Sequence, residues 1–215
     1  MVLWDQAVYF LRDLMFAYAQ ATNGNLAAGI VAVTFVARVV LLPFTLHLAR
    51  SAAVQQTVMR RLKPELDGIR AKFRNDPRRI ADEARRIFER ESTSLVPVSG
   101  CVGVLLQAPI LLALFQAVRQ CAEFGGRFTW IRDIAKPDPI LAILVAALTV
   151  GSVAAGPQPD PTLSNRLVLM VIPGVITLIA LWQMAAGVGL YWGVSSGVSV
   201  VQGVMVRRWL AKTAA

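Results

Sequence analysis

The chain has 215 residues, of which 56% are hydrophobic and only 16% charged, and its formal net charge is +9. Soluble domains carry about 25% charged residues, and here the charges are clumped, which leaves several windows of about 20 residues almost free of them. This pattern excludes an ordinary soluble domain and predicts an all-α integral membrane protein. Direct nucleic-acid recognition is not expected, because the sequence shows neither aromatic-rich strands nor a reading helix.

The first 21 residues carry apolar side chains at helical spacing and have none of the features of a cleaved secretory signal. We interpret residues 1–21 as an amphipathic helix that lies in the membrane interface, where aromatic side chains act as anchors. Trp4 and Tyr18 are the expected anchors. The apolar positions are Trp4, Val8, Leu11, Met15 and Tyr18.

Five transmembrane spans are predicted from the apolar windows. A turn at "TNGN" (22–25) precedes the first, and "KPDP" opens the short third one. The fourth and fifth spans are separated by only a few residues, so we expect them to be antiparallel neighbours. The spans are 26–48, 95–118, 139–155, 166–184 and 188–206; residues 119–138 form an extracytoplasmic loop, 156–165 a cytoplasmic loop and 207–215 a short cytoplasmic tail.

The distribution of Lys and Arg predicts the orientation. One side of the predicted topology carries sixteen of these residues and the other side carries five, with Arg38 inside a span. Basic loops stay in the cytoplasm. We therefore expect a multi-pass protein of a bacterial plasma membrane, with its N-terminus outside and its C-terminus in the cytoplasm.

Residues 50–91 are the longest polar segment, with 12 of the 22 Lys and Arg and 7 of the 13 Asp and Glu. Apolar residues recur every three or four positions, which predicts a cytoplasmic helical hairpin with a narrow apolar seam. Pro64 suits the start of one helix and Pro77, after a turn at 75–77, the start of the next. Most of the charges are expected to face solvent beside anionic lipid, and the narrow seam predicts a mobile hairpin. The seam comprises Leu62, Leu66, Ile69, Phe73, Ile80, Ala84, Ile87 and Phe88.

Arg38 lies near the middle of the first span, where a charge costs about 2.5 to 17 kcal/mol. Its central position argues against snorkelling to an interface. No Asp or Glu lies inside the predicted spans, so an internal ion pair would require Glu123, Asp133 or Asp138 to fold back inward. Arg38 is therefore expected to face a hydrated cavity and to belong to a functional site.

Other polar residues lie inside the predicted spans. Thr34 shares a helix face with Arg38, and Gln107 either joins helices by a hydrogen bond or lines a cavity. Trp192 begins the fifth span, where it could also be an aromatic anchor. This span continues with Ser195, Ser196, Ser199 and Gln202, and its glycines at 187, 189, 193, 197 and 203 favour close helix packing.

Enzymatic chemistry has little support in the sequence. Ser195 and Ser196 have no His or Lys partner in their span, and the single histidine, His47, lies at the far end of the first span. Cys101 and Cys121 lack metal-ligand spacing. We expect no catalytic residue, no metal and no cofactor.

Five stretches are distinctive in combination: "TFVARVVLLPFT", "LKPELDGIRAKFRNDPRRIADEARRIFERE", "VPVSGCVGVLLQAPILLALF", "WIRDIAKPDP" and "GVGLYWGVSSGVSVVQG". Together, in this order, they resemble the YidC/Oxa family of membrane protein insertases. Departures are Val96, Gly103 and Ser196, where the family commonly has Asn, Pro and Asn, and a very short tail after Arg208. The large periplasmic domain of Gram-negative members is also missing, so the chain resembles the minimal bacterial form.

The resemblance implies five helices around a hydrophilic groove that is open to the cytoplasm and to lipid. Arg38, Thr34, Gln107 and Trp192 match groove-lining positions, and Arg38 would attract acidic tails of nascent membrane proteins. The hairpin would receive the nascent chain. The sequence leaves contact with the Sec translocon or a ribosome open. Two other readings are a small anion transporter or channel that uses Arg38 as its selectivity charge, and an assembly factor that binds one partner.

Overall fold

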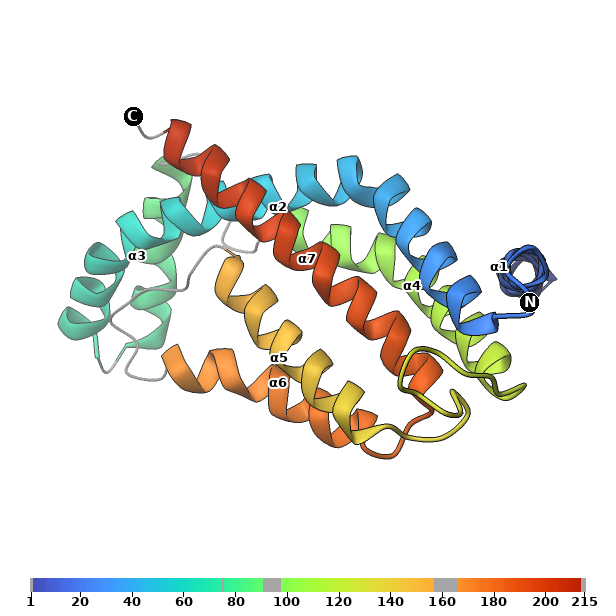
Figure 1. Cartoon of the computed structure of the whole chain (residues 1–215). Coiled ribbons are helices and arrows are strands. Elements are labelled where there is room, and N and C mark those ends of the chain that lie inside the picture. The colour runs from blue at the N-terminus through green and yellow to red at the C-terminus, as the bar shows by residue number, and fades with distance from the viewer. Residues whose placement is uncertain (1, 75, 91–97, 157–165, 214–215) are drawn as a thin grey trace.

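The computed structural model describes residues 2–74, 76–90, 98–156 and 166–213, without the side chains of residues 2–3, 98–107, 166–169 and 213. Within these ranges the fold is helical and contains no strand (Figure 1). An isolated β-bridge joins Phe128 and Ile131. The helices are α1 (Val2–Ala21), α2 (Leu26–Lys72), α3 (Pro77–Arg90), α4 (Val98–Ala122), α5 (Pro139–Ala155), α6 (Arg166–Leu181) and α7 (Ala186–Thr213).

Helix α7 is the centre of the bundle and packs against α2, α4 and α5. Helix α5 lies between α6 and α7 (Figure 1), so α6 packs mainly on α5 and barely touches α7. The sequence predicted that the fourth and fifth spans are antiparallel neighbours, but α5 separates α6 from α7 along most of their length. The short link between α6 and α7 brings only their ends together, while small residues let α5 approach both helices.

Glycines account for this close packing. A Cβ atom at Gly203 would lie 2.8 Å from the carbonyl carbon of Ala155 in α5, and one at Gly189 would lie 2.7 Å from the Leu141 side chain. Gly193 similarly faces Val145 of α5, and Gly187 faces Ala122 of α4. Four of the five predicted packing glycines of α7 thus meet a neighbouring helix. Gly197 does not, because no atom lies within 4 Å of the position that a Cβ atom would take there.

Helix α2 is continuous from Leu26 to Lys72 and arches over the bundle (Figure 1). Its first turn is capped by Asn25, whose side chain accepts a hydrogen bond from the Ala28 amide at 3.1 Å. The predicted boundary between a span ending at 48 and a hairpin starting at 50 is not a break in the helix. Pro64 lies inside α2 and does not begin a helix. The residues between the predicted end of the span at 48 and Pro64 are mostly good helix formers, so no residue in this stretch ends the helix.

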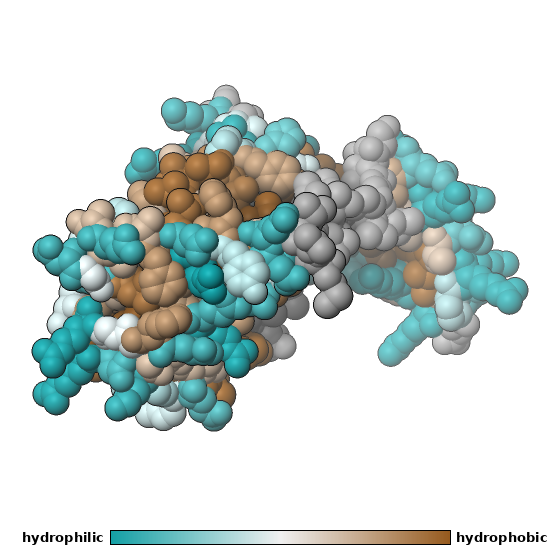
Figure 2. Space-filling model, turned by 90° about the vertical axis from the view of Figure 1, so that its right-hand side faces the viewer, coloured by the Kyte–Doolittle hydropathy of each residue, from teal (hydrophilic) through white to brown (hydrophobic). Residues whose placement is uncertain are grey.

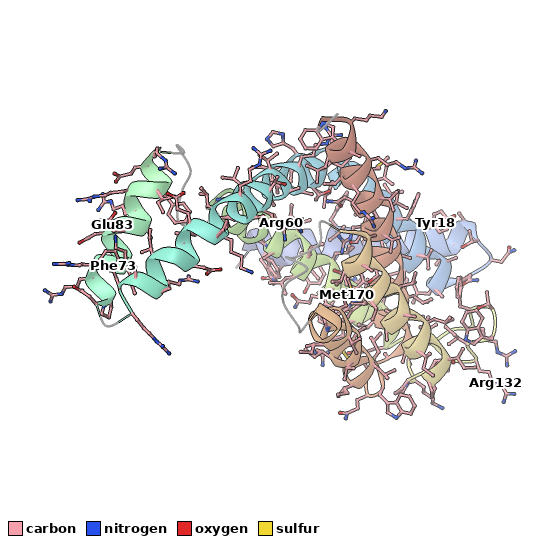
Figure 3. The ribbon with its side chains drawn as sticks, turned by 90° about the vertical axis from the view of Figure 1, so that its left-hand side faces the viewer. Tyr18, Arg60, Phe73, Glu83, Arg132 and Met170 are labelled. Carbon is pink, nitrogen blue, oxygen red and sulfur yellow. The ribbon has the colours of Figure 1, made fainter. Side chains whose placement is uncertain are left out.

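The C-terminal part of α2 and helix α3 form the predicted hairpin, and α3 begins at Pro77 as expected. Leu62, Ile87 and Phe88 are buried between the two helices, with Leu66, Ile69 and Ala84 packed beside them. Phe73 and Ile80 lie outside this cluster, near the tip of the hairpin, where Phe73 ends α2. Figure 3 shows Phe73 and Glu83 on the hairpin, away from the bundle, with Arg132 at the opposite end of the molecule. An ion pair of 2.9 Å joins Arg90 to Glu65 across the two helices.

Helix α1 lies across the ends of α2 and α4 and is seen end-on in Figure 1. Its predicted membrane-facing stripe largely meets protein: Val8 and Met15 are buried in the core, and the Trp4 indole donates a hydrogen bond to Gln116 of α4 at 2.9 Å. Trp4 is therefore not a free interfacial anchor. The exposed apolar face of α1 consists of Tyr9, Phe10, Leu14 and Tyr18.

The segment between α4 and α5 is held against the bundle. Its Ile131 and Ile134 side chains are buried, and the Gly187 amide donates a hydrogen bond to the Ile134 carbonyl at 2.9 Å. Asp138 caps α5, whose bounds match the predicted 139–155. Helix α4 extends to Ala122, past the predicted end at 118, and α7 continues to Thr213 through most of the predicted tail. Of the predicted loop 156–165, residues 157–165 lie outside the described residues.

Apolar side chains cover much of the outside of the bundle. Figure 2 shows hydrophobic surface on the bundle and a mainly hydrophilic hairpin behind it. Among the described residues, α2 is the one helix long and apolar enough to cross a membrane by length and composition, with a mean hydropathy of 2.2 in its most apolar window. Helix α6 turns a continuous apolar face outward, made of Val171, Ile172, Val175, Ile176 and Ile179.

Candidate functional site: a cavity around Arg38

Four helices line an open cavity of about 380 Å³, here called the Arg38 cavity. Helix α2 contributes the arginine, α4 contributes apolar side chains, and α5 and α7 contribute hydroxyl groups. Arg38 is the only charged residue among the described side chains that line it. The lining residues are Arg38, Leu111, Leu112, Phe115, Thr149, Ser152, Tyr191, Trp192, Ser195, Ser196 and Ser199.

The Arg38 side chain crosses from α2 to α7, where two residues one turn apart contact it. Its Nε atom donates a hydrogen bond to the Ser195 hydroxyl at 3.1 Å. The Tyr191 hydroxyl also interacts with the guanidinium and donates a hydrogen bond to the Leu111 carbonyl of α4 at 3.4 Å. Arg38 is thus held by neutral oxygen atoms and keeps its positive charge uncompensated by them.

Hydroxyl groups on α5 and α7 form a large part of the polar lining of the cavity. The Thr149 and Ser196 hydroxyls are 3.3 Å apart and join the two helices. Ser152 donates to the Thr149 carbonyl at 2.7 Å, and Ser199 donates to the Ser195 carbonyl at 2.9 Å. The Ser152 and Ser199 hydroxyls thus donate their hydrogens to backbone carbonyls of their own helices. The lone pairs of the two hydroxyl oxygens remain available to accept hydrogen bonds in the cavity.

Beyond the cavity, toward the hairpin, polar contacts hold α2 against α7. The Gln202 amide donates to the Thr45 carbonyl at 3.0 Å, and the Thr45 hydroxyl donates to the Gln202 side-chain oxygen at 3.3 Å. Further along, the Arg50 guanidinium lies 5.5 Å from the centre of the Trp209 ring. Gln202, part of the predicted polar face of the fifth span, therefore joins helices and is not among the cavity-lining residues.

The sequence-predicted site residues are only partly brought together. Arg38 and Trp192 both line the cavity, and Trp192 lies inside α7, two turns from its start. Thr34 is fully buried and does not line it; its hydroxyl has no hydrogen-bond partner among the described residues. The side chain of Gln107 lies outside those that the structure describes.

Two of the three acidic residues considered as internal partners of Arg38, Asp133 and Asp138, make other contacts. Asp138 caps α5 by accepting a hydrogen bond from the Leu141 amide at 2.7 Å, and Asp133 lies 3.8 Å from Lys136. Across the described ranges, no carboxylate forms an ion pair with Arg38 and none lines the cavity.

Six polar lining residues were missed as site residues by the sequence analysis. Tyr191, Thr149 and Ser152 were not considered at all, and Ser195, Ser196 and Ser199 were noted only as the polar face of the fifth span. A signal was present for Tyr191, because Tyr191, Ser195 and Ser199 repeat every four residues and so share one face of α7. Thr149 and Ser152 are three residues apart and share a face of α5 in the same way. Their position in the same cavity as Arg38 depends on helix packing, which the spacing does not reveal.

The arrangement can bind an anion without carrying out covalent chemistry. A fixed cation among hydroxyl oxygens, in a cavity partly walled by Leu and Phe, favours a carboxylate or a similar anion. It also allows polar segments to enter, because the hydroxyls can replace part of the water that a peptide loses.

Comparison with known proteins gives a consistent set of relatives. The profile of a family described as "60Kd inner membrane protein" matches residues 17–213. The protein named membrane protein insertase YidC 1 from Halalkalibacterium halodurans is 28% identical over 206 residues, which cover 93% of this chain and 77% of that protein. The membrane protein insertase YidC of Actinobacillus pleuropneumoniae is 30% identical over 215 residues, or 97% of this chain but only 38% of the relative.

A solved structure has the same fold. It is a crystal structure of an active YidC insertase with its first transmembrane domain resolved, and it matches with a TM-score of 0.60 at 20% sequence identity. The match covers 95% of this chain and 45% of that one. The chain therefore spans less than half the length of this structure and of the relatives from Actinobacillus.

Proposed function

This chain belongs to the 60Kd inner membrane protein family, the YidC/Oxa family, and from that premise we propose that it is a membrane protein insertase and chaperone. Its substrates are nascent membrane proteins, and its working site is a hydrophilic intramembrane groove that contains the Arg38 cavity. Support comes from the names of relatives, one of which this chain covers over 77% of its length.

The observation that carries the proposal is the uncompensated guanidinium of Arg38 in a cavity lined by hydroxyl groups. A charge in this position is costly unless something uses it. A substrate with an acidic residue in its translocated tail would supply the missing counter-ion while it passes. Because the groove is hydrated, the tail crosses a shorter apolar distance and loses less of its own hydration.

The remaining elements have proposed roles around this site. Five helices, α2 and α4 to α7, span the membrane, with the N-terminus outside and the α2–α3 hairpin in the cytoplasm, as the distribution of Lys and Arg favours. The apolar seam of the hairpin, opened at its tip, receives the nascent chain. The apolar helix of the substrate then partitions into lipid beside the outward faces of α5 and α7. Neither a nucleotide nor a metal takes part.

Reconstitution tests the proposed function. Liposomes that contain the purified protein should insert a short single-span substrate with an acidic N-terminal tail, whereas empty liposomes should not. The main alternative is an anion transporter or channel that uses Arg38 as its selectivity charge. Liposomes that release a trapped anion through the protein but insert no substrate would establish that alternative.

A hydrated groove open to the cytoplasm predicts site-specific labelling. In a chain with Cys101→Ser and Cys121→Ala, a Ser152→Cys or Ser199→Cys variant should react with a charged maleimide added to inverted membrane vesicles. The control is Ile176→Cys on the outward face of α6, where lipid excludes the reagent. Equal labelling at all three positions, or none at the cavity positions, would contradict a water-filled groove.

A further inference from the structure

We propose that Ser195 is a positioning residue that fixes the guanidinium of Arg38 as a two-pronged receptor for a carboxylate; this rests on the proposed function and deepens it. Ser195 binds the Nε atom, the one guanidinium nitrogen on the inner edge of the group. The two terminal nitrogens can then face the cavity together. Without this contact, the charge would remain but its orientation would not.

The environment of Ser195 suits this role. Ser195 is 5% exposed, and its hydroxyl oxygen accepts the hydrogen bond from Arg38 across the α2–α7 contact. Tyr191, one turn earlier on α7, lies against the same guanidinium and is itself tied to α4 through the Leu111 carbonyl. Residues of α7 therefore orient the Arg38 side chain, although Arg38 itself belongs to α2.

Orientation matters because an arginine side chain is long and flexible, while its fork is flat and rigid. A carboxylate gains two parallel hydrogen bonds only when both terminal nitrogens point at it. A hydrogen bond to Nε fixes the plane of the guanidinium and leaves the edge with the two terminal nitrogens available to the carboxylate. No nitrogen of Arg38 is among the buried atoms that lack a partner in the described part of the chain. A receptor requires terminal nitrogens that are not buried without a partner, and those of Arg38 meet this condition.

Ser196 is a matched control for Ser195. It is the adjacent residue on α7, it also lines the cavity, and its side chain is 7% exposed. Its hydroxyl, however, pairs with Thr149 of α5 and not with Arg38. Replacing either serine with alanine removes one buried hydroxyl from the same wall, but only one of the replacements frees the guanidinium.

The test measures tail selectivity, which is the insertion yield of an acidic-tailed substrate divided by that of the same substrate with a neutral tail. In reconstituted liposomes, Ser195→Ala should lower this ratio about three- to tenfold, as expected for the net contribution of a typical intramolecular hydrogen bond. Ser196→Ala also removes a cavity hydroxyl, so it should lower both yields by the same factor and leave the ratio at its wild-type value. Ser195→Thr, which retains the hydroxyl, should restore most of it.

A double-mutant comparison separates positioning from a general effect on folding. With Arg38→Ala already present, adding Ser195→Ala should not change the ratio further. The inference is overturned if Ser195→Ala keeps the wild-type ratio, if Ser196→Ala lowers it equally, or if Ser195→Ala lowers it further without Arg38. A wild-type protein that inserts neither substrate overturns the proposed function itself, which makes the two failures distinguishable.

Discussion

Replacing Arg38 with alanine should lower the insertion of an acidic-tailed substrate about tenfold, which corresponds to about 1.4 kcal/mol. Two opposite charges about 4 Å apart attract by roughly 4 kcal/mol at an effective dielectric constant near 20, and water in the cavity screens part of this attraction. A neutral-tailed substrate should lose much less, because it has no charge for Arg38 to attract. The measurement is the protected fraction of each substrate in liposomes that contain equal amounts of either protein.

The Arg38→Lys variant is the control that keeps the positive charge but removes the planar, forked shape of the guanidinium. Lysine keeps the positive charge but lacks both the fork and the Nε atom that Ser195 binds. It should restore part of the acidic-tail yield and leave it below the wild-type value. Equal losses of both substrates in Arg38→Ala would mean that Arg38 holds the fold together instead of attracting the tail.

Replacing Gly203 with alanine should destabilise the protein, although alanine is the better helix former. The added Cβ would lie 2.8 Å from the carbonyl carbon of Ala155 and 3.0 Å from its oxygen, and a backbone in α5 cannot yield as a side chain can. Overpacking of this kind costs about 1–3 kcal/mol. Since 1 kcal/mol shifts the melting temperature of a chain of this size by about 2–4 °C, a fall of several degrees is expected.

Gly197→Ala is the matched control on the same helix. No atom lies within 4 Å of the place its Cβ would occupy, so the substitution should bring only the gain in helix propensity, about 0.8–1.0 kcal/mol. Thermal unfolding in detergent should therefore move in opposite directions for the two variants. A fall of the same size in both would show that the close contact between α5 and α7 at Ala155 does not limit stability.

Local signals predicted much of the helical arrangement. Asn25, Pro77 and Asp138 stand at or beside helix starts because each satisfies or avoids a free backbone amide there. The sequence also shows that the predicted spans contain no Asp or Glu that could pair with Arg38. Within the described ranges, the cavity around Arg38 is lined by no acidic residue.

Features that depend on long-range packing could not be predicted. Helix α1 carries apolar residues on two faces, and its periodicity does not show that Met15 meets protein while Phe10 stays exposed. The position of α5 between α6 and α7 follows from close contacts such as that of Gly203 with Ala155. Tyr191 enters the site for the same reason, since only the packing of α7 against α2 and α4 brings its hydroxyl to Arg38.

Complementation of a bacterium depleted of its own insertase tests the central claim most directly. The full chain, produced at a level verified in the membrane fraction, should restore growth and the insertion of an acidic-tailed substrate. The Arg38→Ala variant at the same level should restore markedly less of that insertion. A wild-type chain that accumulates in the membrane but supports neither growth nor insertion would contradict the proposal that this protein is an insertase.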